Sequence, residues 1–244
     1  MRLGTPRLHL RRVDSTNLRA RELAAAGAPH GTLVTASEQT AGRGRQGRAW
    51  TAPADSALLA SLVIRRPAPL LSLAAGVAVA LVAERLDVAG RRAMVKWPND
   101  VLLDGRKVAG ILVEGRPQAG WAVLGIGLNL AVELRSLGAD LAARSATLGL
   151  SADAREPALA ALLAELERVL AEDEAAVLAE LRERDALRHR TVTWSGGTGL
   201  ADGIDARGRL IVRAGAGPVA LDAGEVHLER GRHAVQRGSH RARA

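Results

Sequence analysis

The chain has 244 residues, 48% of them hydrophobic, which is enough to bury the core of one large domain or of a large and a small one. Aromatic residues make up only 2%, all of them tryptophan, so a base-stacking platform for single-stranded nucleic acid is poorly supplied. The absence of cysteine excludes disulfides, a thiolate nucleophile and a cysteine-ligated metal, while the formal net charge of +8 leaves a polyanionic partner open.

The first half of the chain alternates between strand and helix patterns. Residues 7–13 alternate apolar and polar side chains and predict a strand, and capping residues at 14–17 predict a helix that ends at Gly27. Further strands are expected at 31–38, 56–66, 93–97 and 121–130, a helix at 70–90, and a hairpin at 101–114 that turns at Asp104 and Gly105.

The pattern changes towards the C-terminus. After an irregular connection, residues 156–188 have apolar side chains at three and four spacing and predict a helical stretch that packs on the protein's own core, with a subunit contact as the alternative. From about residue 190, short β segments separated by glycines predict a small barrel-like β domain.

The last fifteen residues carry most of the net positive charge. Residues 230–244 contain five arginines and no acid, so the rest of the chain has a charge of +8 − 5 = +3. We expect a disordered, solvated tail, with weak polyanion binding as the alternative. Because no segment has the length and apolarity of a signal peptide or a membrane span, we expect a soluble, cytoplasmic protein with no membrane partner.

A glycine-rich loop follows the second strand. Gly42, Gly44 and Gly47 formally satisfy the G-x-G-x-x-G pattern, but Trp50 and Pro53 follow where a dinucleotide site needs a helix N-terminus. We therefore reject a Rossmann site. A mobile loop whose arginines close over an anionic ligand fits better, and a solvated basic loop is the alternative.

Two residue types are rare and lie in a few short segments. Lys96 and Lys107 are the two lysines among 34 basic residues, and Asn17, Asn99 and Asn129 are the three asparagines. Lysine is a compact point charge, whereas arginine grips two oxygens with a planar fork, so a retained lysine indicates a site that needs one donor.

Four segments occur together in order: "DSTN", "EQTAGRGRQGRAW", "KWPNDVLLDGRKVAGILVE" and "GIGLNL". With them the chain resembles the biotin protein ligases, also called biotin–[acetyl-CoA-carboxylase] ligases, over roughly residues 5–230. The resemblance implies an α+β fold, with a mixed sheet and helices like those of class II aminoacyl-tRNA synthetases, followed by a small SH3-like β-barrel. The implied domains are a catalytic biotin- and ATP-binding domain at 1–188, an SH3-like domain at 189–229 and the basic tail at 230–244.

The resemblance also implies a two-step reaction. Biotin and ATP would form biotinyl-5′-AMP and pyrophosphate, and a lysine of a biotin carboxyl carrier domain would then take the biotinyl group. Since the first strand begins within about ten residues of Met1, the resemblance is to the monofunctional type, without the N-terminal helix-turn-helix domain, and no sequence-specific DNA partner is expected. A homodimer stays open.

The motif match implies a role for each site residue. Biotin would contact Ser15, Thr16, Asn17, Gln39, Arg43, Gly44, Arg45 and Lys96, and ATP or the adenylate would contact Arg43, Arg45, Arg48, Trp50, Asn99, Lys107 and Asn129. Lys96, Arg45 and Asp100 would be catalytic, with Mg²⁺ near Asp100 as a further expectation. Gln46 stands where a further basic residue is common in the family, which would loosen the hold on the adenylate slightly.

The chemistry of the two steps agrees with these roles. The carboxylate nucleophile is already ionised, so the first step needs charge neutralisation and no general base, and Lys96 can follow one oxygen as it becomes the bridging oxygen. In the second step the acceptor lysine must lose a proton, and Asp100 is the candidate that orients or deprotonates it, with capping of the turn after Pro98 as the alternative. Lys107 is either a phosphate contact or a hairpin-surface lysine.

Two other functions remain as alternatives. A lipoate or octanoate ligase or transferase would share the fold, but the S-T-N triplet and the basic glycine loop favour a ureido ring over a dithiolane. A nucleic-acid-binding protein built on the tail and the β domain is the non-enzyme alternative. The six histidines show no ligand spacing, so no metal site is predicted from a side-chain cluster.

Overall fold

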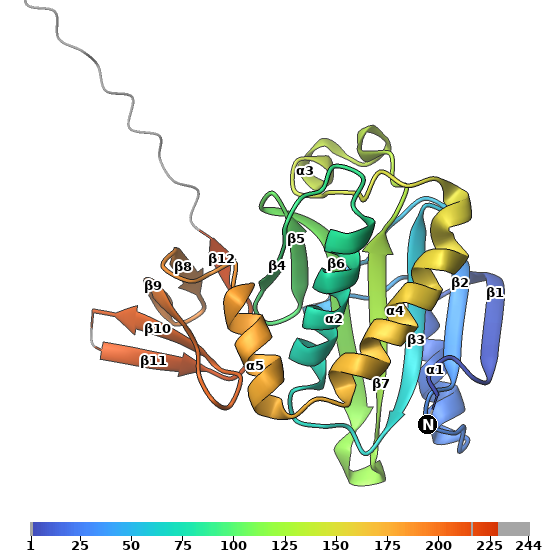
Figure 1. Cartoon of the computed structure of the whole chain (residues 1–244), viewed down its shortest axis with the longest axis horizontal. Coiled ribbons are helices and arrows are strands. Elements are labelled where there is room, and N and C mark those ends of the chain that lie inside the picture. Colours follow the sequence, from blue (N-terminus) through green and yellow to red (C-terminus); the bar gives the residue numbers. More distant parts are fainter. Residues whose placement is uncertain (1, 216, 229–244) are drawn as a thin grey trace, which may run out of the picture.

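The computed structural model describes residues 2–215 and 217–228, and of residues 116 and 117 only the backbone. Its larger part is a seven-stranded mixed sheet with the order β1-β2-β3-β7-β6-β5-β4 (Figure 1). The strands are β1 (Arg7–Val13), β2 (Leu33–Gln39), β3 (Ala57–Arg65), β4 (Ala93–Lys96), β5 (Asp100–Leu103), β6 (Arg106–Arg116) and β7 (Trp121–Asn129). Only β1 and β2 pair in parallel among these neighbours, so the predicted mixed sheet is confirmed.

The parallel pair β1 and β2 needs a crossover, which helix α1 (Thr16–Ala25) supplies. Ser15 has extended backbone angles and its side chain accepts a hydrogen bond from the Leu18 amide, so it caps the helix. Gly27, at a φ of +92°, follows the last turn as the sequence predicts. The first turn of α1 therefore begins where β1 ends, at one edge of the sheet.

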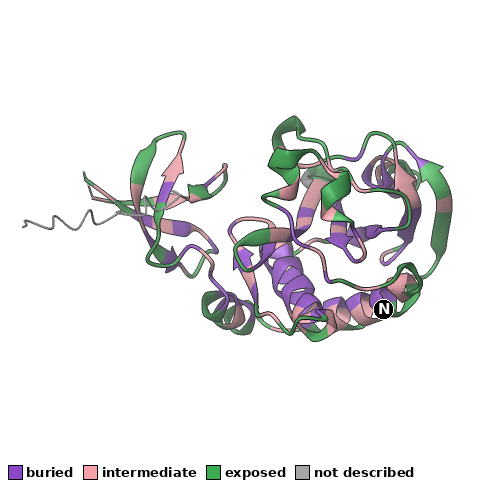
Figure 2. Ribbon diagram, turned by 90° about the horizontal axis from the view of Figure 1, so that it is seen from above, coloured by how far each residue is buried: buried purple, intermediate pink, exposed green. Residues whose placement is uncertain are grey.

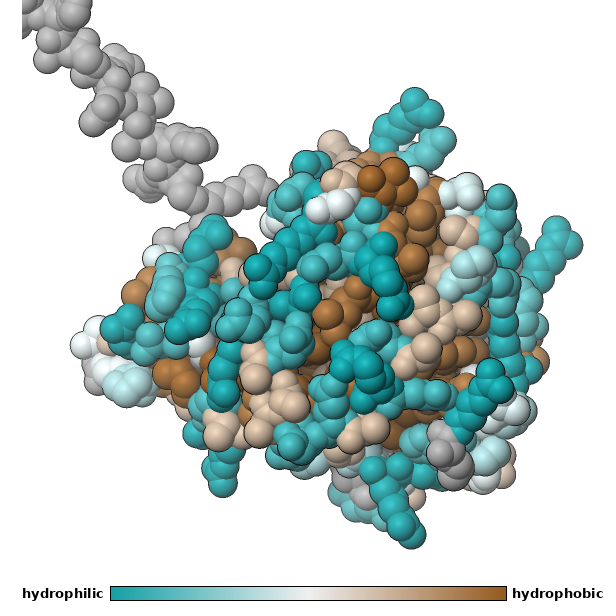
Figure 3. All heavy atoms as spheres, viewed as in Figure 1, coloured by the Kyte–Doolittle hydropathy of each residue, from teal (hydrophilic) through white to brown (hydrophobic). Residues whose placement is uncertain are grey.

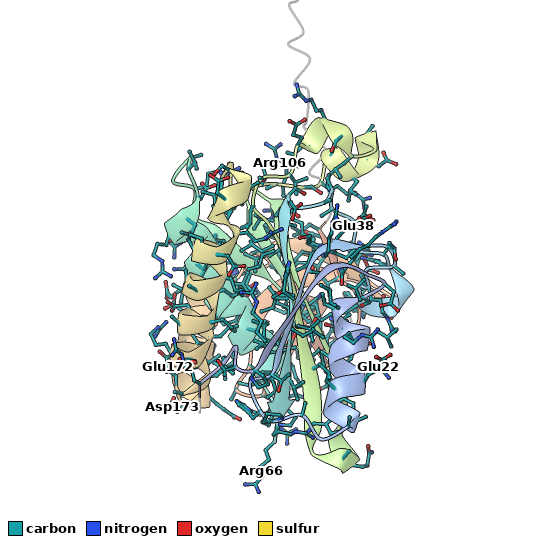
Figure 4. All side chains as sticks on the ribbon, turned by 90° about the vertical axis from the view of Figure 1, so that its right-hand side faces the viewer. Glu22, Glu38, Arg66, Arg106, Glu172 and Asp173 are labelled. Carbon is teal, nitrogen blue, oxygen red and sulfur yellow. The ribbon has the colours of Figure 1, made fainter. Side chains whose placement is uncertain are left out.

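The two faces of the sheet pack against different helices. Alternate residues of β3 and β7 belong to separate clusters: Leu62 and Leu124 pack with α2 (Leu71–Leu86) and α4 (Arg155–Leu170), whereas Val63 and Val123 pack with α1. Figure 4 shows α1, with Glu22, and α4, ending near Glu172, on opposite sides of the sheet. Figure 2 shows α2 as the most deeply buried helix.

The outer side of α4 meets solvent, whereas α2 is buried along most of its length. In Figure 3 hydrophobic side chains are visible between hydrophilic ones over these two helices. Leu162 and Leu166 of α4 are buried in the main core cluster, so the expected packing of this region on the protein's own core is confirmed. No helix in residues 2–215 and 217–228 is long and apolar enough to cross a membrane.

The helical stretch expected at 156–188 is broken into two helices, α4 and α5 (Glu174–Glu183). Asp173 has extended backbone angles, and its Oδ1 accepts a hydrogen bond from the Ala176 amide at 2.8 Å. This new N-cap starts a second helix, so the stretch is helical for most of its length, as expected, but it is divided at Asp173. The preceding irregular connection contains one short α-helix, α3 (Ala139–Ala142), between two single-turn 3-10 helices.

The C-terminal part is a five-stranded antiparallel sheet with the order β11-β10-β9-β8-β12. Its strands are β8 (Thr191–Trp194), β9 (Gly197–Ile204), β10 (Leu210–Ala214), β11 (Gly217–Leu221) and β12 (His227–Leu228). The Trp97 indole donates a hydrogen bond to the Gly208 carbonyl at 3.0 Å and so joins this sheet to the end of β4. The tail expected at 230–244 lies outside the described residues.

Candidate active site

A cavity lies on the α1 side of the large sheet, between α1, the glycine loop and a loop of the C-terminal sheet. It brings together thirteen of the predicted site residues: Ser15, Thr16, Asn17, Gln39, Arg43, Gly44, Arg45, Arg48, Trp50, Lys96, Asn99, Asp100 and Lys107. Predicted residues as far apart in sequence as Ser15 and Lys107 therefore line one site. Gly224, Glu225 and Val226 of the C-terminal part complete the lining.

The polar end of the cavity is built around the first turn of α1. The Gln39 side-chain oxygen accepts two hydrogen bonds from Thr16, from the amide at 2.8 Å and from the hydroxyl at 3.0 Å. The Ser61 hydroxyl donates to Asn17 Oδ1 at 2.6 Å and lies 2.9 Å from Thr16 Oγ1. Ser15, Thr16, Asn17 and Ser61 are all buried, so this network is shielded from water.

Asn17 is held from a second side by β6. Its Nδ2 donates to Glu114 Oε2 at 2.9 Å and lies 3.4 Å from the Leu112 carbonyl oxygen. Gly125 of β7 lies beneath the amide, because a Cβ there would stand only 2.0 Å from Asn17 Oδ1. A side chain at position 125 would therefore push Asn17 out of the cavity.

Gly127, two residues along β7, makes the same kind of space for Trp50. A Cβ at Gly127 would lie 2.4 Å from Trp50 Cε2, and a Cβ at Gly110 of β6 would lie 3.1 Å from Trp50 Cζ3. Gly110 and Gly127 are paired in the sheet, so together they form a flat floor under the indole. The "GIGLN" segment thus places Asn17 over its first glycine and Trp50 over its second.

The glycine loop folds back on itself and crosses the cavity. The Gly44 amide donates to the Arg48 carbonyl at 2.7 Å, and the Trp50 amide donates to the Gly42 carbonyl at 2.9 Å. Its arginines reach three different partners: Arg43 pairs with Glu114 at 3.2 Å, Arg45 donates to Asn99 Oδ1 at 3.3 Å, and Arg48 pairs with Glu225.

Lysines and arginines gather at the other end of the cavity. Burial lowers the pKa of Lys96, and the nearby Asp100 carboxylate partly offsets this shift. Burial also lowers the pKa of Arg45. Lys107 Nζ lies 2.7 Å from Asp100 Oδ1 and 5.5 Å from the centroid of the Trp50 ring. A dense positive charge that is partly removed from water is suited to bind anions.

The structure does not bring Asn129 into this cavity. Its side-chain amide is buried and donates to the Ala146 carbonyl at 2.9 Å, so in the structure it ties the end of β7 to the following connection. Three contacts were missed from the sequence: Ser61, Glu114 and Glu225. The alternation of β3 could have revealed Ser61, because Leu59, Ser61 and Val63 face one side of the strand.

Within the described residues, no three His, Cys, Asp or Glu side chains form a group able to hold a metal by themselves. Mg²⁺ that serves ATP chemistry is usually held by one or two carboxylates together with substrate phosphates. Asp100 offers one such carboxylate at the cationic end of the cavity, so the residues fit a magnesium ion that arrives with a nucleotide.

Comparison with known proteins gives two family matches. Residues 9–130 match the biotin/lipoate A/B protein ligase family, and residues 188–228 match the biotin protein ligase C-terminal domain. The biotin–[acetyl-CoA-carboxylase] ligase of Mycobacterium tuberculosis is 38% identical over 226 residues, which cover 86% of this chain and 84% of that protein.

Other relatives match over different lengths. The bifunctional ligase/repressor BirA of Bacillus subtilis is 41% identical over 126 residues, and this match covers 48% of the chain and only 38% of that protein. Among solved structures, the biotin protein ligase of Aquifex aeolicus in complex with biotin and ATP aligns with a TM-score of 0.79 and 26% identity, covering 93% of this chain and 100% of that one.

These matches confirm the predicted fold class, a mixed sheet with helices followed by a small SH3-like domain. They span both parts of the chain, and the motifs that carry them line one cavity. The chain belongs to the biotin/lipoate A/B protein ligase family and has the C-terminal domain of the biotin protein ligases.

Proposed function

We propose that this protein is an ATP-dependent biotin ligase, which activates biotin to biotinyl-5′-AMP and transfers the biotinyl group to a lysine of a biotin carboxyl carrier domain. The observation that carries the proposal is the pattern of donors and acceptors at the polar end of the cavity, combined with the cations at the other end. Biotin has a cyclic urea at one end and a carboxylate at the other, and this cavity complements both.

The hydrogen bonds fix the orientation of the two amides at the polar end. Both bonds to the Gln39 oxygen come from Thr16, which leaves the Gln39 nitrogen to donate to a ligand oxygen. The Asn17 oxygen has one donor, Ser61, among the described residues and keeps an acceptor site for a ligand N–H.

A urea has one carbonyl oxygen and two N–H groups, so it can use both kinds of site. A dithiolane ring offers no N–H and no carbonyl, and would leave these buried groups unpaired. Unpaired buried polar groups cost about 1–3 kcal/mol each, which supports biotin over lipoate.

In the first step a carboxylate oxygen of biotin attacks the α-phosphorus of ATP. The new bond joins that oxygen to phosphorus, the bond from the α-phosphorus to the oxygen bridging to the β-phosphorus breaks, and pyrophosphate leaves with the electron pair. Lys96 would donate to the oxygen that changes role, and Arg45 and Arg48 would neutralise the phosphates, whereas Arg43, paired with Glu114, would close over the polar end of the ligand. Asp100 and the ATP phosphates would hold Mg²⁺, which neutralises phosphate charge when bound.

The nucleotide would bind beside Trp50, above the floor formed by Gly110 and Gly127. Trp50 packs against this floor, and Lys107 Nζ lies 5.5 Å from the centroid of its ring, so the indole would offer an apolar contact for the adenine base next to a cation for phosphate. Asn99 would face the nucleotide. Asn129 would contribute to nucleotide binding only indirectly, by holding the end of β7 in place through its bond to the Ala146 carbonyl. Lys107 would exchange its contact with Asp100 for one with the nucleotide.

In the second step the acceptor lysine loses its proton, and its nitrogen attacks the acyl carbon of the mixed anhydride. The bond between that carbon and the adenylate oxygen breaks, and AMP leaves. Asp100 would orient the incoming amine or take its proton, because it is the carboxylate nearest to the predicted reaction centre at Lys96 in sequence and pairs opposite it in the β4–β5 hairpin.

Labelling of a carrier domain tests this function directly. The protein, ATP, Mg²⁺ and biotin are incubated with an isolated biotin carboxyl carrier domain, and its intact mass is measured. We expect one added biotinyl group on the wild-type domain and none on a domain whose acceptor lysine is replaced by arginine. An unmodified wild-type carrier in the presence of biotinyl-5′-AMP would contradict the transfer step.

A further inference from the structure

Glu114 is a half-buried carboxylate behind the polar end of the cavity: it is not part of the lining, but it contacts the lining residues Asn17 and Arg43. It lies on β6, two and four residues after Leu112 and Gly110, so all three project from the same face of the strand. Its side chain is 18% exposed and contacts Asn17 at 2.9 Å, Arg43 at 3.2 Å and Arg21 at 3.5 Å.

The contact with Asn17 decides which way the amide points. A rotated amide would place Oδ1 against the Glu114 carboxylate, where two acceptors repel each other. The Ser61 hydroxyl on the other side can donate or accept, so it tolerates both orientations. The negative charge of Glu114, assisted by the more distant Leu112 carbonyl, therefore excludes the orientation in which Asn17 would present N–H groups to a ligand.

The contact with Arg43 links the same carboxylate to the glycine loop. Arg43 is exposed and comes from the loop, whereas Arg21 comes from α1, so Glu114 joins three elements around the polar end of the cavity. Two arginines also balance its charge, which allows a carboxylate to remain near a site that binds an anionic substrate.

We propose that Glu114 is a positioning residue for substrate selection: it fixes the Asn17 amide as an acceptor for a ureido N–H and anchors Arg43 of the glycine loop over that end of the ligand. This inference rests on the proposed function, since it concerns how the biotin ring is selected. It predicts that loss of Glu114 weakens biotin binding and ring discrimination without a matching loss of nucleotide binding.

The test uses three variants in ATP–pyrophosphate exchange. Glu114→Ala removes the contacts with both Asn17 and Arg43, whereas Glu114→Gln keeps an acceptor oxygen for Asn17 and loses the ion pair. Glu165→Ala is the matched control, because Glu165 has a side chain 12% exposed and also contacts two arginines, Arg85 and Arg168, which do not line the cavity.

We expect Glu114→Ala to raise the KM for biotin at least about tenfold, the effect of losing a buried hydrogen bond that involves a charged group, and to change the KM for ATP less than about threefold. Glu114→Gln should restore most of the biotin KM. Discrimination between biotin and its analogues methylated on either ureido nitrogen should fall in Glu114→Ala and stay near wild type in Glu165→Ala. Trypsin should cut the loop after Arg43 faster in both Glu114 variants than in the control.

A biotin KM within about threefold of wild type in folded Glu114→Ala would overturn the inference, as would equal rises in the KM values for biotin and ATP. Unfolding temperatures of all variants and direct calorimetric biotin binding separate folding from selection. The wild type reports on the proposed function by itself: no biotin-dependent exchange there rejects that function and this inference together, whereas an active wild type with insensitive variants rejects only the role of Glu114.

Discussion

Lys107 and Asp100 form an ion pair of 2.7 Å at the cationic end of the cavity, across neighbouring strands β5 and β6. The pair joins two residues with different proposed roles. Asp100 would orient or deprotonate the acceptor lysine, and Lys107 would contact the nucleotide. Release of Lys107 to phosphate would expose the Asp100 carboxylate to the incoming lysine.

Asp100→Asn tests the second step. Removal of a general base or orienting charge should slow transfer from preformed biotinyl-5′-AMP by about 10²-fold, measured as single-turnover labelling of the carrier domain. Asp104→Asn at the tip of the same hairpin is the control, because Asp104 has a φ of 48° that asparagine also adopts readily. Transfer at the wild-type rate in Asp100→Asn would remove Asp100 from this role.

Lys96→Arg tests the need for a single donor in the first step. The larger planar fork cannot follow one oxygen in a half-buried position, so we expect a loss of about 10²–10³-fold in the rate of adenylate formation. Lys107→Arg should keep its ion pair with Asp100 and lose far less. Near-normal adenylation in Lys96→Arg would mean that any cation suffices at this position.

Alanine at the two glycines of β7 should affect different substrates. Gly125→Ala displaces the Asn17 amide and should raise the KM for biotin, whereas Gly127→Ala displaces the Trp50 ring and should raise the KM for ATP, each by about tenfold or more. Gly138→Ala is the control, since nothing lies within 4 Å of a Cβ there. The assignment of the two ends of the cavity fails if both variants affect the same substrate.

The pH dependence of exchange should report Lys96. Burial lowers the pKa of Lys96 in the free protein, and the anions of bound biotin and ATP favour its charged form and raise the pKa again. Since the reaction needs the ammonium form, kcat/KM for biotin at low ATP should fall on the alkaline side at a lower pH than kcat does. If kcat/KM and kcat fell at the same alkaline pH, bound substrates would not raise the pKa of Lys96.

Asp173→Ala tests the break between α4 and α5. Loss of the hydrogen bond to the Ala176 amide should lower the free energy of unfolding by about 1 kcal/mol, measured by urea denaturation. Asp173→Asn, which keeps an N-cap acceptor, should remain close to wild type. Equal stability of the alanine variant would mean that tertiary packing alone holds the start of α5.

Local signals predicted most of the fold. The turn at Asp104 and Gly105, with φ values of 48° and 73°, forms as the sequence indicates, because both residues suit the left-handed conformation of a tight hairpin. The break at Asp173 was not predicted, because apolar spacing continues across it and one N-cap residue weighs little against a long periodic pattern.

The candidate site was predicted from rare residues and motifs, and these signals identified most of its residues but not all of them. Lys96 and Asn17 line the cavity, but the equally rare Asn129 donates to the Ala146 carbonyl instead. Ser61 lies in an apolar strand, and its role depends on the register that places it beside Gly125. Such cross-strand contacts arise only when the sheet is assembled, so they escape analysis of each segment alone.

ATP–pyrophosphate exchange shows which acid the protein activates. Purified protein with Mg²⁺ and ATP is supplied in turn with biotin, lipoate, octanoate or no acid, and the incorporation of labelled pyrophosphate into ATP is measured. We expect exchange with biotin alone, because only its urea satisfies Gln39 and Asn17. Exchange with lipoate or octanoate instead of biotin, or with none of the acids, would contradict it.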